Sequence, residues 1–263
     1  VVIKEKGKKK KEKEKIIETI HYAIQQIPEV NGAMIVMDPH TGAIISSASW
    51  PSYDANNFGV TAARDPSRFI NPATTSVYEP GSVMKAITAV AALESGLYTP
   101  NTKIQDEAVL VLDNGATKVR NADHKSKGSM TLTAALAWSR NIVFSKVGLS
   151  LGKTTSNAAA RLYATWLRFG FGGKTGVDVP SESQGLVNDP TKRRWRQIDL
   201  ANASFGHGVG TTLMQLAVAY SAIVNGGVLV RPRVVESVDG VPIPITVRGT
   251  ATTPEVSAQM IKM

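Results

Sequence analysis

Apolar residues recur along the chain with two different periods, and these predict where helices and strands lie. Five isoleucines at helical spacing predict an amphipathic helix over residues 16–27, ended by Pro28 (Ile16, Ile17, Ile20, Ile24 and Ile27). Residues 33–37 and 43–49 are predicted strands, joined by the turn sequence Asp-Pro-His-Thr-Gly. Residues 82–95, 131–138, 142–148, 156–169 and 212–224 are predicted helices, 109–112 is a predicted strand, and 55–80 is expected to be irregular. The pattern alone predicts a mixed α and β protein.

Length and composition narrow the class of protein to which the chain can belong. The 263 residues are enough for one sizeable core, and the absence of cysteine is compatible with an extracytoplasmic bacterial protein. No apolar run approaches the ~20 residues that a membrane helix needs. Trp138, Trp166 and Trp195 are expected to pack in the core or at an interface between lobes, and not to serve as platforms for a ligand.

Positive charge is concentrated at the start of the chain. The net charge is +9, and residues 1–15 contain eight lysines and three glutamates. We treat 1–15 as a solvated, charged lead-in to a domain over 16–263, with attraction to anionic lipid or wall polymers as the alternative. No nucleic-acid-binding motif accompanies the charge, so no nucleic acid partner is expected. The four histidines lack metal-ligand spacing, and we expect neither a metal nor a cofactor.

A serine and a lysine three residues apart are the candidate chemistry. Ser82 follows the turn sequence Pro-Gly and opens the predicted helix 82–95, so Lys85 lies on the same helix face and can reach its hydroxyl. The positive end of the helix dipole favours negative charge near Ser82. The alternative is that Ser82 is a helix N-cap and Lys85 a solvated lysine. A second Ser-x-x-Lys, Ser150 to Lys153, contains a glycine and is predicted to be a loop between helices.

Seven segments in order resemble the transpeptidase domain of class B penicillin-binding proteins, from about residue 16 to the C-terminus. They include the family's opening hairpin, its "PSYDPN" segment (with Ala55 where proline is usual), the "EPGSxxK" motif and the "SxN" motif. Later segments match a structural "GFG..TG.D.P.E" stretch, an "SFGHG" stretch and a closing helix with its cap. The segments are 32–45, 50–56, 78–85, 138–141, 169–182, 204–208 and 212–227.

The resemblance implies a fold and four site residues. The fold is the α/β (α+β) penicillin-binding transpeptidase or serine β-lactamase type, with a helical lobe beside an antiparallel sheet. Ser82 is implied as the nucleophile and Lys85 as its base. Ser139 is implied as a proton relay, and Asn141 as a ligand of both Lys85 and the substrate amide. The four residues are the predicted catalytic set, with Ser82, Ser139 and Asn141 also binding substrate.

The family's third motif, Lys-Thr/Ser-Gly on a strand beside the site, has no clear counterpart. Lys174-Thr175-Gly176 has the right letters but glycine-rich surroundings that predict a loop, and it lacks the spacing of a phosphate-binding loop. The run 253–262 is predicted to be the helix that precedes the third motif in the family. We therefore expect the chain to end before that motif, with the C-terminal strands missing, and to acylate more slowly than a version extended through it.

The resemblance also implies a reaction and a location. The enzyme would be a serine-type D,D-transpeptidase that cross-links peptidoglycan stem peptides and is blocked by β-lactam antibiotics. It would lie on the extracytoplasmic side of the bacterial cell membrane, held by an anchor outside this chain, with a glycosyltransferase partner. Two alternatives stay open: a β-lactam-hydrolysing or β-lactam-sensing protein of the same fold, and a non-catalytic cell-wall scaffold.

Overall fold

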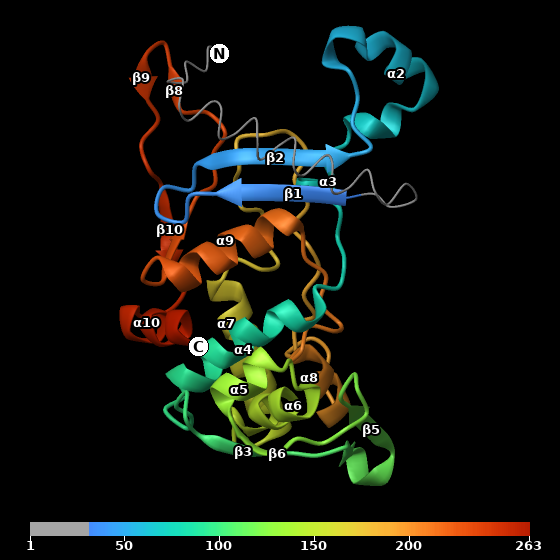
Figure 1. Ribbon diagram of the computed structural model, residues 1–263, viewed down its shortest axis with the longest axis vertical. Helices are drawn as coiled ribbons and strands as arrows, with labels where there is room; N and C mark the ends of the chain where they lie inside the picture. Colours follow the sequence, from blue (N-terminus) through green and yellow to red (C-terminus); the bar gives the residue numbers. More distant parts are fainter. Residues whose placement is uncertain (1–31) are drawn as a thin grey trace.

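An antiparallel hairpin opens the part of the chain that this computed structural model describes, residues 32–263 (Figure 1). Strand β1 (Gly32–Met37) pairs with β2 (Ile44–Trp50), from Gly32 opposite Trp50 to Met37 opposite Ile44. The Asp38 carboxylate accepts two backbone N–H bonds in the connecting turn, at 2.8 and 3.1 Å. The two predicted strands are confirmed. The predicted helix 16–27 and the charged lead-in 1–15 lie outside the described residues.

The segment between the hairpin and Ser82 is more helical than its sequence predicted. It forms η1 (Ala55–Asn57), α2 (Phe58–Arg64), η2 (Pro66–Phe69) and α3 (Pro72–Thr75). Asp54 and Asn71 cap two of these turns through their side chains. Helices of seven residues or fewer are too short to show a periodic apolar pattern, so the pattern missed them. Figure 1 shows α2 projecting away from the body of the molecule.

A helical lobe surrounds one central helix. The 3-10 turn η3 (Gly81–Met84) leads into α4 (Lys85–Glu94), in which every residue from Lys85 to Leu93 is buried. A helix that is buried on all sides belongs in a core. Helices α5, α6 and α7 pack against it, and α8 packs on α6 and α7 (Figure 1). Their bounds are Leu132–Ala137, Asn141–Ser150, Thr155–Arg168 and Gln197–Ala203. The first three were predicted; α8 was not.

Two nested β-hairpins close the other end of this lobe. Strand β3 (Lys103–Asp106) pairs with β6 (Gly128–Thr131). Between them, β4 (Val109–Leu112) pairs with β5 (Thr117–Arg120), with η4 (Asp113–Gly115) at the turn. The loop from β5 back to β6 therefore returns to the end of β3, beside the start of α6.

The C-terminal third joins the hairpin to the lobe. Helix α9 (Leu213–Val224) is largely buried and lies against β1, and α10 (Pro254–Lys262) packs on α9 and α4. Strand β7 (Val228–Val230) pairs with β10 (Val247–Thr250), and β8 (Ser237–Val238) pairs with β9 (Val241–Pro242). Helices with antiparallel strands confirm the predicted fold class.

The tryptophans only partly follow their predicted place in the core. Trp166 and Trp195 are buried and pack on each other, with ring centroids 5.7 Å apart. Trp138 is 62% exposed, and the Lys127 ammonium lies 3.9 Å from the centroid of its ring. The prediction is wrong for Trp138 because it follows α5 in the loop that leads to Ser139, outside the packed helices.

Candidate active site

The Ser82 hydroxyl stands exposed at the entrance of the central helix. Gly81 has φ of +63°, a conformation suited to glycine, and this turns the chain into η3 so that Ser82 lies one turn before Lys85. Ser82 Oγ lies 2.9 Å from Lys85 Nζ. The cap position before η3 is Pro80, and no side chain caps that turn. The structure therefore does not support the alternative that Ser82 is an N-cap.

The turn that presents Ser82 is held by a segment far along the chain, residues 204–211. Gly81 N–H donates to the Gly206 carbonyl (3.1 Å), and Gly208 N–H donates to the Glu79 carboxylate (2.7 Å). Tyr78 and Thr211 exchange two backbone bonds of 3.1 and 2.9 Å. The sequence singled out this "SFGHG" segment only by resemblance. Its position shows a physical role, which is to fix the backbone on which the nucleophile sits.

Gly206 offers a test of that role with a matched control. A Cβ on Gly206 would lie 1.9 Å from the Gly81 carbonyl oxygen, whereas a Cβ on Gly208 would meet nothing within 4 Å; φ is positive at both. We expect Gly208→Ala to lose about 1–2 kcal/mol of unfolding free energy from backbone strain. Gly206→Ala should lose about 1–3 kcal/mol more from overlap, and slow acylation at Ser82. Urea denaturation of both variants measures the two losses of unfolding free energy. Equal losses would contradict the proposal that Gly206 fixes the backbone at Gly81.

Lys85 lies at the centre of the candidate site. Its side chain is 1% exposed, and its Nζ contacts Ser82 Oγ, Ser139 Oγ (2.9 Å), the Ser139 carbonyl oxygen (2.8 Å) and Asn141 Oδ1 (2.7 Å). Ser139 occupies the loop between α5 and α6, and Asn141 is the first residue of α6. The structure thus brings together all four residues predicted from the sequence.

The hydrogen-bond partners of Lys85 suit a neutral amine. The Ser139 carbonyl and Asn141 Oδ1 can only accept, so they use two N–H groups. The Asn141 amide is fixed in that orientation because its Nδ2 donates to the Arg120 carbonyl at 3.1 Å. A neutral amine has two N–H groups and one lone pair, so the lone pair can accept from one of the two serine hydroxyls that lie 2.9 Å away. This is the arrangement that a base needs in order to take a proton from Ser82.

The electrostatic environment makes the neutral state of Lys85 easier to reach. Burial lowers the pKa of Lys85, and the positive charge of Arg140 lowers it further, to about 8. At pH 7 a lysine with an ordinary pKa of about 10.4 is neutral in roughly one molecule in 2,500, whereas a pKa of about 8 leaves about a tenth neutral. The Phe205 ring lies 5.9 Å from the ammonium and forms part of the apolar surroundings.

Ser139 is held in an unusual backbone conformation. Its φ is +53°, in the left-handed region that few residues other than glycine adopt. Its backbone N–H donates to the Leu136 carbonyl (3.0 Å), and the residue is exposed. Strain of this kind is concentrated at functional sites, where the surrounding structure maintains it. Here it lets both the carbonyl and the hydroxyl of one residue face Lys85.

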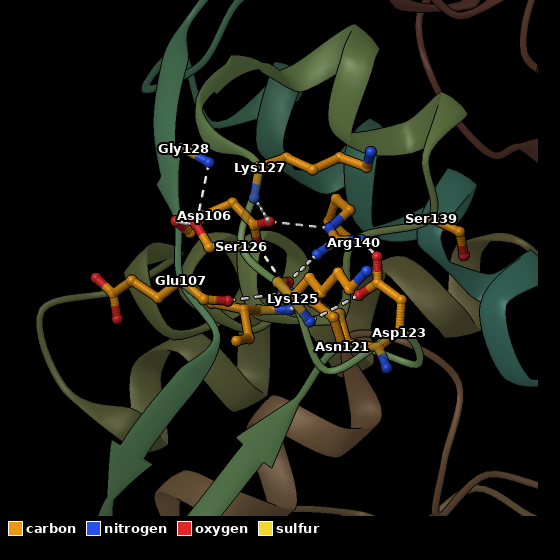
Figure 2. A network of polar contacts seen from close by, with 12 residues as sticks. Asp106, Glu107, Asn121, Asp123, Lys125, Ser126, Lys127, Gly128, Ser139 and Arg140 are labelled. Atoms are coloured by element: carbon orange, nitrogen blue, oxygen red, sulfur yellow. Dashed lines mark hydrogen bonds and ion pairs between the residues drawn. The ribbon is translucent and has the colours of Figure 1, made fainter.

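Sequence reasoning missed the polar network that supports this loop (Figure 2). Arg140, between Ser139 and Asn141, is 4% exposed and pairs with Asp106 (2.9 Å) and Asp123 (2.8 Å). Asp106 ends β3 and Asp123 lies in the loop after β5, so no local spacing connects them to Arg140. The only signal in the sequence was an arginine within the "SxN" motif.

The other candidate motifs lie elsewhere. Lys174-Thr175-Gly176 is in a loop, as predicted, where Thr175 is buried and donates to Glu182 through both its N–H (2.7 Å) and its hydroxyl. Ser150 ends α6 and Lys153 follows it in the loop before α7, at a cavity of about 420 Å³ that none of the four site residues lines. Neither motif contributes to the site around Lys85.

Within residues 32–263, no helix has the length and apolar character to cross a membrane. In the same range, no three histidine, cysteine, aspartate or glutamate side chains gather in a way that would hold a metal ion.

Known proteins resemble the chain over the whole described range. The penicillin binding protein transpeptidase domain matches residues 32–263. Peptidoglycan D,D-transpeptidase MrdA of Acinetobacter baumannii is 33% identical over 243 residues, covering 86% of this chain and 35% of MrdA. Penicillin-binding protein PbpB of Mycolicibacterium smegmatis is 30% identical over 231 residues, covering 84% of this chain and 34% of PbpB. The chain spans about a third of the length of these relatives.

A solved structure has a similar fold. The transpeptidase domain of Burkholderia pseudomallei penicillin-binding protein 3 superposes with a TM-score of 0.76 at 25% sequence identity. The match covers 96% of this chain and 67% of that one.

Proposed function

Because this chain belongs to the penicillin-binding protein transpeptidase family, we propose that it is the catalytic part of a peptidoglycan D,D-transpeptidase with Ser82 as its nucleophile. The observation that carries the proposal is a buried lysine amine whose contacts are an exposed serine hydroxyl, a second serine and a fixed carboxamide oxygen. Serine enzymes need a hydroxyl beside a group that can take its proton, and this geometry supplies both.

Acylation assigns one task to each residue. Neutral Lys85 accepts the Ser82 proton while Ser82 Oγ attacks the carbonyl carbon between two terminal D-alanines of a stem peptide. The oxyanion accepts a hydrogen bond from the Ser82 backbone N–H at the start of the helix, with the family's third-motif strand as the expected second donor. When the C–N bond breaks, the Ser139 hydroxyl passes a proton from Lys85 to the leaving amine of D-alanine.

Transfer then reverses the proton movements. The amine of a neighbouring stem peptide attacks the ester carbonyl, an amide forms, and Ser82 Oγ leaves and recovers its proton. Asn141 holds Lys85 throughout through Oδ1. One of its two amide N–H groups is used by the Arg120 carbonyl, which leaves the other for the substrate amide. A β-lactam would enter the same route and stop at the acyl-enzyme.

The setting of the whole protein is part of the proposal. Stem peptides are attached to glycan strands, so cross-linking is coupled to a glycosyltransferase that makes those strands. This substrate lies outside the cytoplasm, and we place the catalytic domain on the extracytoplasmic side of the bacterial cell membrane. Roles in cell shape or cell division follow from the same chemistry.

A peptide ending in D-Ala-D-Ala tests the proposed reaction. Incubation should release D-alanine and add the mass of the remaining acyl group to the protein, and a peptide ending in L-Ala-L-Ala should do neither. Rapid, repeated hydrolysis of penicillin would instead favour the β-lactam-hydrolysing alternative. A folded protein that neither releases D-alanine nor reacts with penicillin would favour a scaffold and contradict the proposal.

A further inference from the structure

A buried ion-pair network lies directly behind the loop that carries Ser139 and Asn141. Arg140 Nε donates to Asp106 Oδ2 (2.9 Å), its Nη1 to Asp123 Oδ2 (2.8 Å), and its Nη2 to the Lys125 carbonyl. Arg140 is 4% exposed and Asp106 is fully buried. Burial of a charged pair is costly unless each charge is fully hydrogen-bonded, and this arginine uses all three of its nitrogens.

The Asp106 carboxylate, which anchors Arg140, is itself held by several hydrogen bonds. Asp106 also accepts from Asn121 Nδ2 (2.9 Å) and from the backbone N–H of Lys127 (2.9 Å). Asn121 Oδ1 in turn accepts from the Ile142 N–H (3.1 Å), in the first turn of α6. Figure 2 shows these side chains converging from the end of β3, the loop after β5 and the start of α6. The network thus ties the residues on both sides of Asn141, Arg140 directly and Ile142 through Asn121, to one buried carboxylate.

We propose that Arg140 is a positioning residue: anchored by Asp106, it fixes Ser139 and Asn141 in contact with Lys85 and places a buried positive charge near that amine. Arg140 immediately follows Ser139, whose left-handed conformation turns its carbonyl and hydroxyl to Lys85. It immediately precedes Asn141, whose Oδ1 lies 2.7 Å from the same amine. A guanidinium that makes several fixed bonds restrains both neighbours at once.

The charge of Arg140 has a second consequence, since it lowers the pKa of Lys85 in addition to the larger effect of burial. Asp106 and Asp123 pair with this guanidinium and restrict its movement. Four other titratable groups of the surrounding segments have partners or neighbours of their own. Glu79 accepts from Gly208, Lys146 pairs with Glu107, the His207 ring meets the Phe205 ring edge-on, and the Lys127 ammonium lies over Trp138. Arg140 is the charged group that acts on the Lys85 amine, so its loss should change the proton affinity of Lys85.

The inference rests on the proposed function, and its test uses two separate readouts. One is the rate of acylation by fluorescent penicillin between pH 6 and pH 10. The other is the titration of the Lys85 side chain by NMR in protein labelled with 13C at lysine Cε, assigned with Lys85→Arg. The NMR readout needs no reaction, so a protein that penicillin does not label would contradict the proposed function and still allow this inference to be tested.

Arg140→Gln should raise the Lys85 titration midpoint by about one pH unit and lower the acylation rate at pH 7 about tenfold or more. Arg140→Lys keeps the charge but not the fork of hydrogen bonds. It should restore the midpoint while the rate stays below that of the parent protein. Arg196→Gln is the matched control because Arg196 pairs with Asp199 at the surface, and it should change neither readout.

A double variant guards against the possibility that Arg140→Gln alone does not fold. Arg140→Gln leaves the Asp106 charge buried and unpaired, which destabilises a fold. Asp106→Asn combined with Arg140→Gln removes both charges, and this pair carries the same test if the single variant does not fold. A Lys85 midpoint that stays unchanged in the folded variants would overturn the inference.

Discussion

Replacing Ser82 by alanine is expected to abolish covalent labelling of the chain by fluorescent penicillin. Among the described residues, Ser139 is the other hydroxyl at the Lys85 amine, also at 2.9 Å, and the proposed mechanism uses it to pass a proton to the leaving group, so it should not take the acyl group itself. In serine enzymes, loss of the nucleophile lowers the rate by about 10⁶-fold. Gel fluorescence after a fixed incubation measures the change.

The chain provides its own control for this experiment. Ser150 and Lys153 have the same spacing as Ser82 and Lys85, but the Ser150 hydroxyl bonds to the Val147 carbonyl and to Tyr98, and Lys153 lines a separate cavity. Ser150→Ala should therefore label at the parent rate. Labelling that survives Ser82→Ala, or that disappears with Ser150→Ala in a folded protein, would contradict the assignment.

The second large effect concerns Lys85 and pH. Acylation needs the neutral amine, and the pKa of Lys85 is lowered to about 8. The rate should therefore rise about tenfold from pH 7 and level off above pH 8 to 9, because protonated Lys85 cannot take the Ser82 proton. Lys85→Arg keeps the positive charge but cannot lose its proton, so the rate should fall about 10²–10⁴-fold.

Lys153→Gln serves as the control for the lysine and should leave both the rate and its pH dependence unchanged. Penicillin acylation reactions quenched at intervals, at five or six pH values, give the rate as a function of pH. A rate that is flat between pH 6 and pH 10, or a Lys85→Arg variant that acylates at the parent rate, would show that Lys85 is not the base.

Much of the fold could be predicted because its longer elements have clear periodicity. Helix α9 and the β1–β2 hairpin were located to within about one residue at each end. Helix α8 was missed because its seven residues are too few to show a helical period. Its start also lacks the usual N-cap signal, because Arg196 stands in the N-cap position and has no acceptor; instead the Asp199 carboxylate accepts from the Arg196 backbone N–H (2.9 Å) and from its side chain.

The four site residues were predicted because Ser82 and Lys85 lie three residues apart at the start of a predicted helix, and the family resemblance supplied Ser139 and Asn141. What supports them could not be predicted. Arg140 meets Asp106 only because the nested hairpins return the chain to the end of β3, and Gly206 meets Gly81 only after α8 has packed on the lobe. Contacts between residues this far apart in the sequence depend on how the chain folds back on itself, and the spacing of nearby residues does not predict them.

The most direct test of the account is to locate the acyl group itself. After reaction with penicillin and acid quenching, trypsin cuts after Arg68 and Lys85 and releases residues 69–85, which contain two serines, Ser76 and Ser82. Fragment masses from tandem mass spectrometry distinguish them. The account predicts the added mass on Ser82 in the parent protein and no added mass in Ser82→Ala. An acyl group on Ser76, Ser139 or any residue outside this peptide would contradict the central claim that Ser82 is the nucleophile.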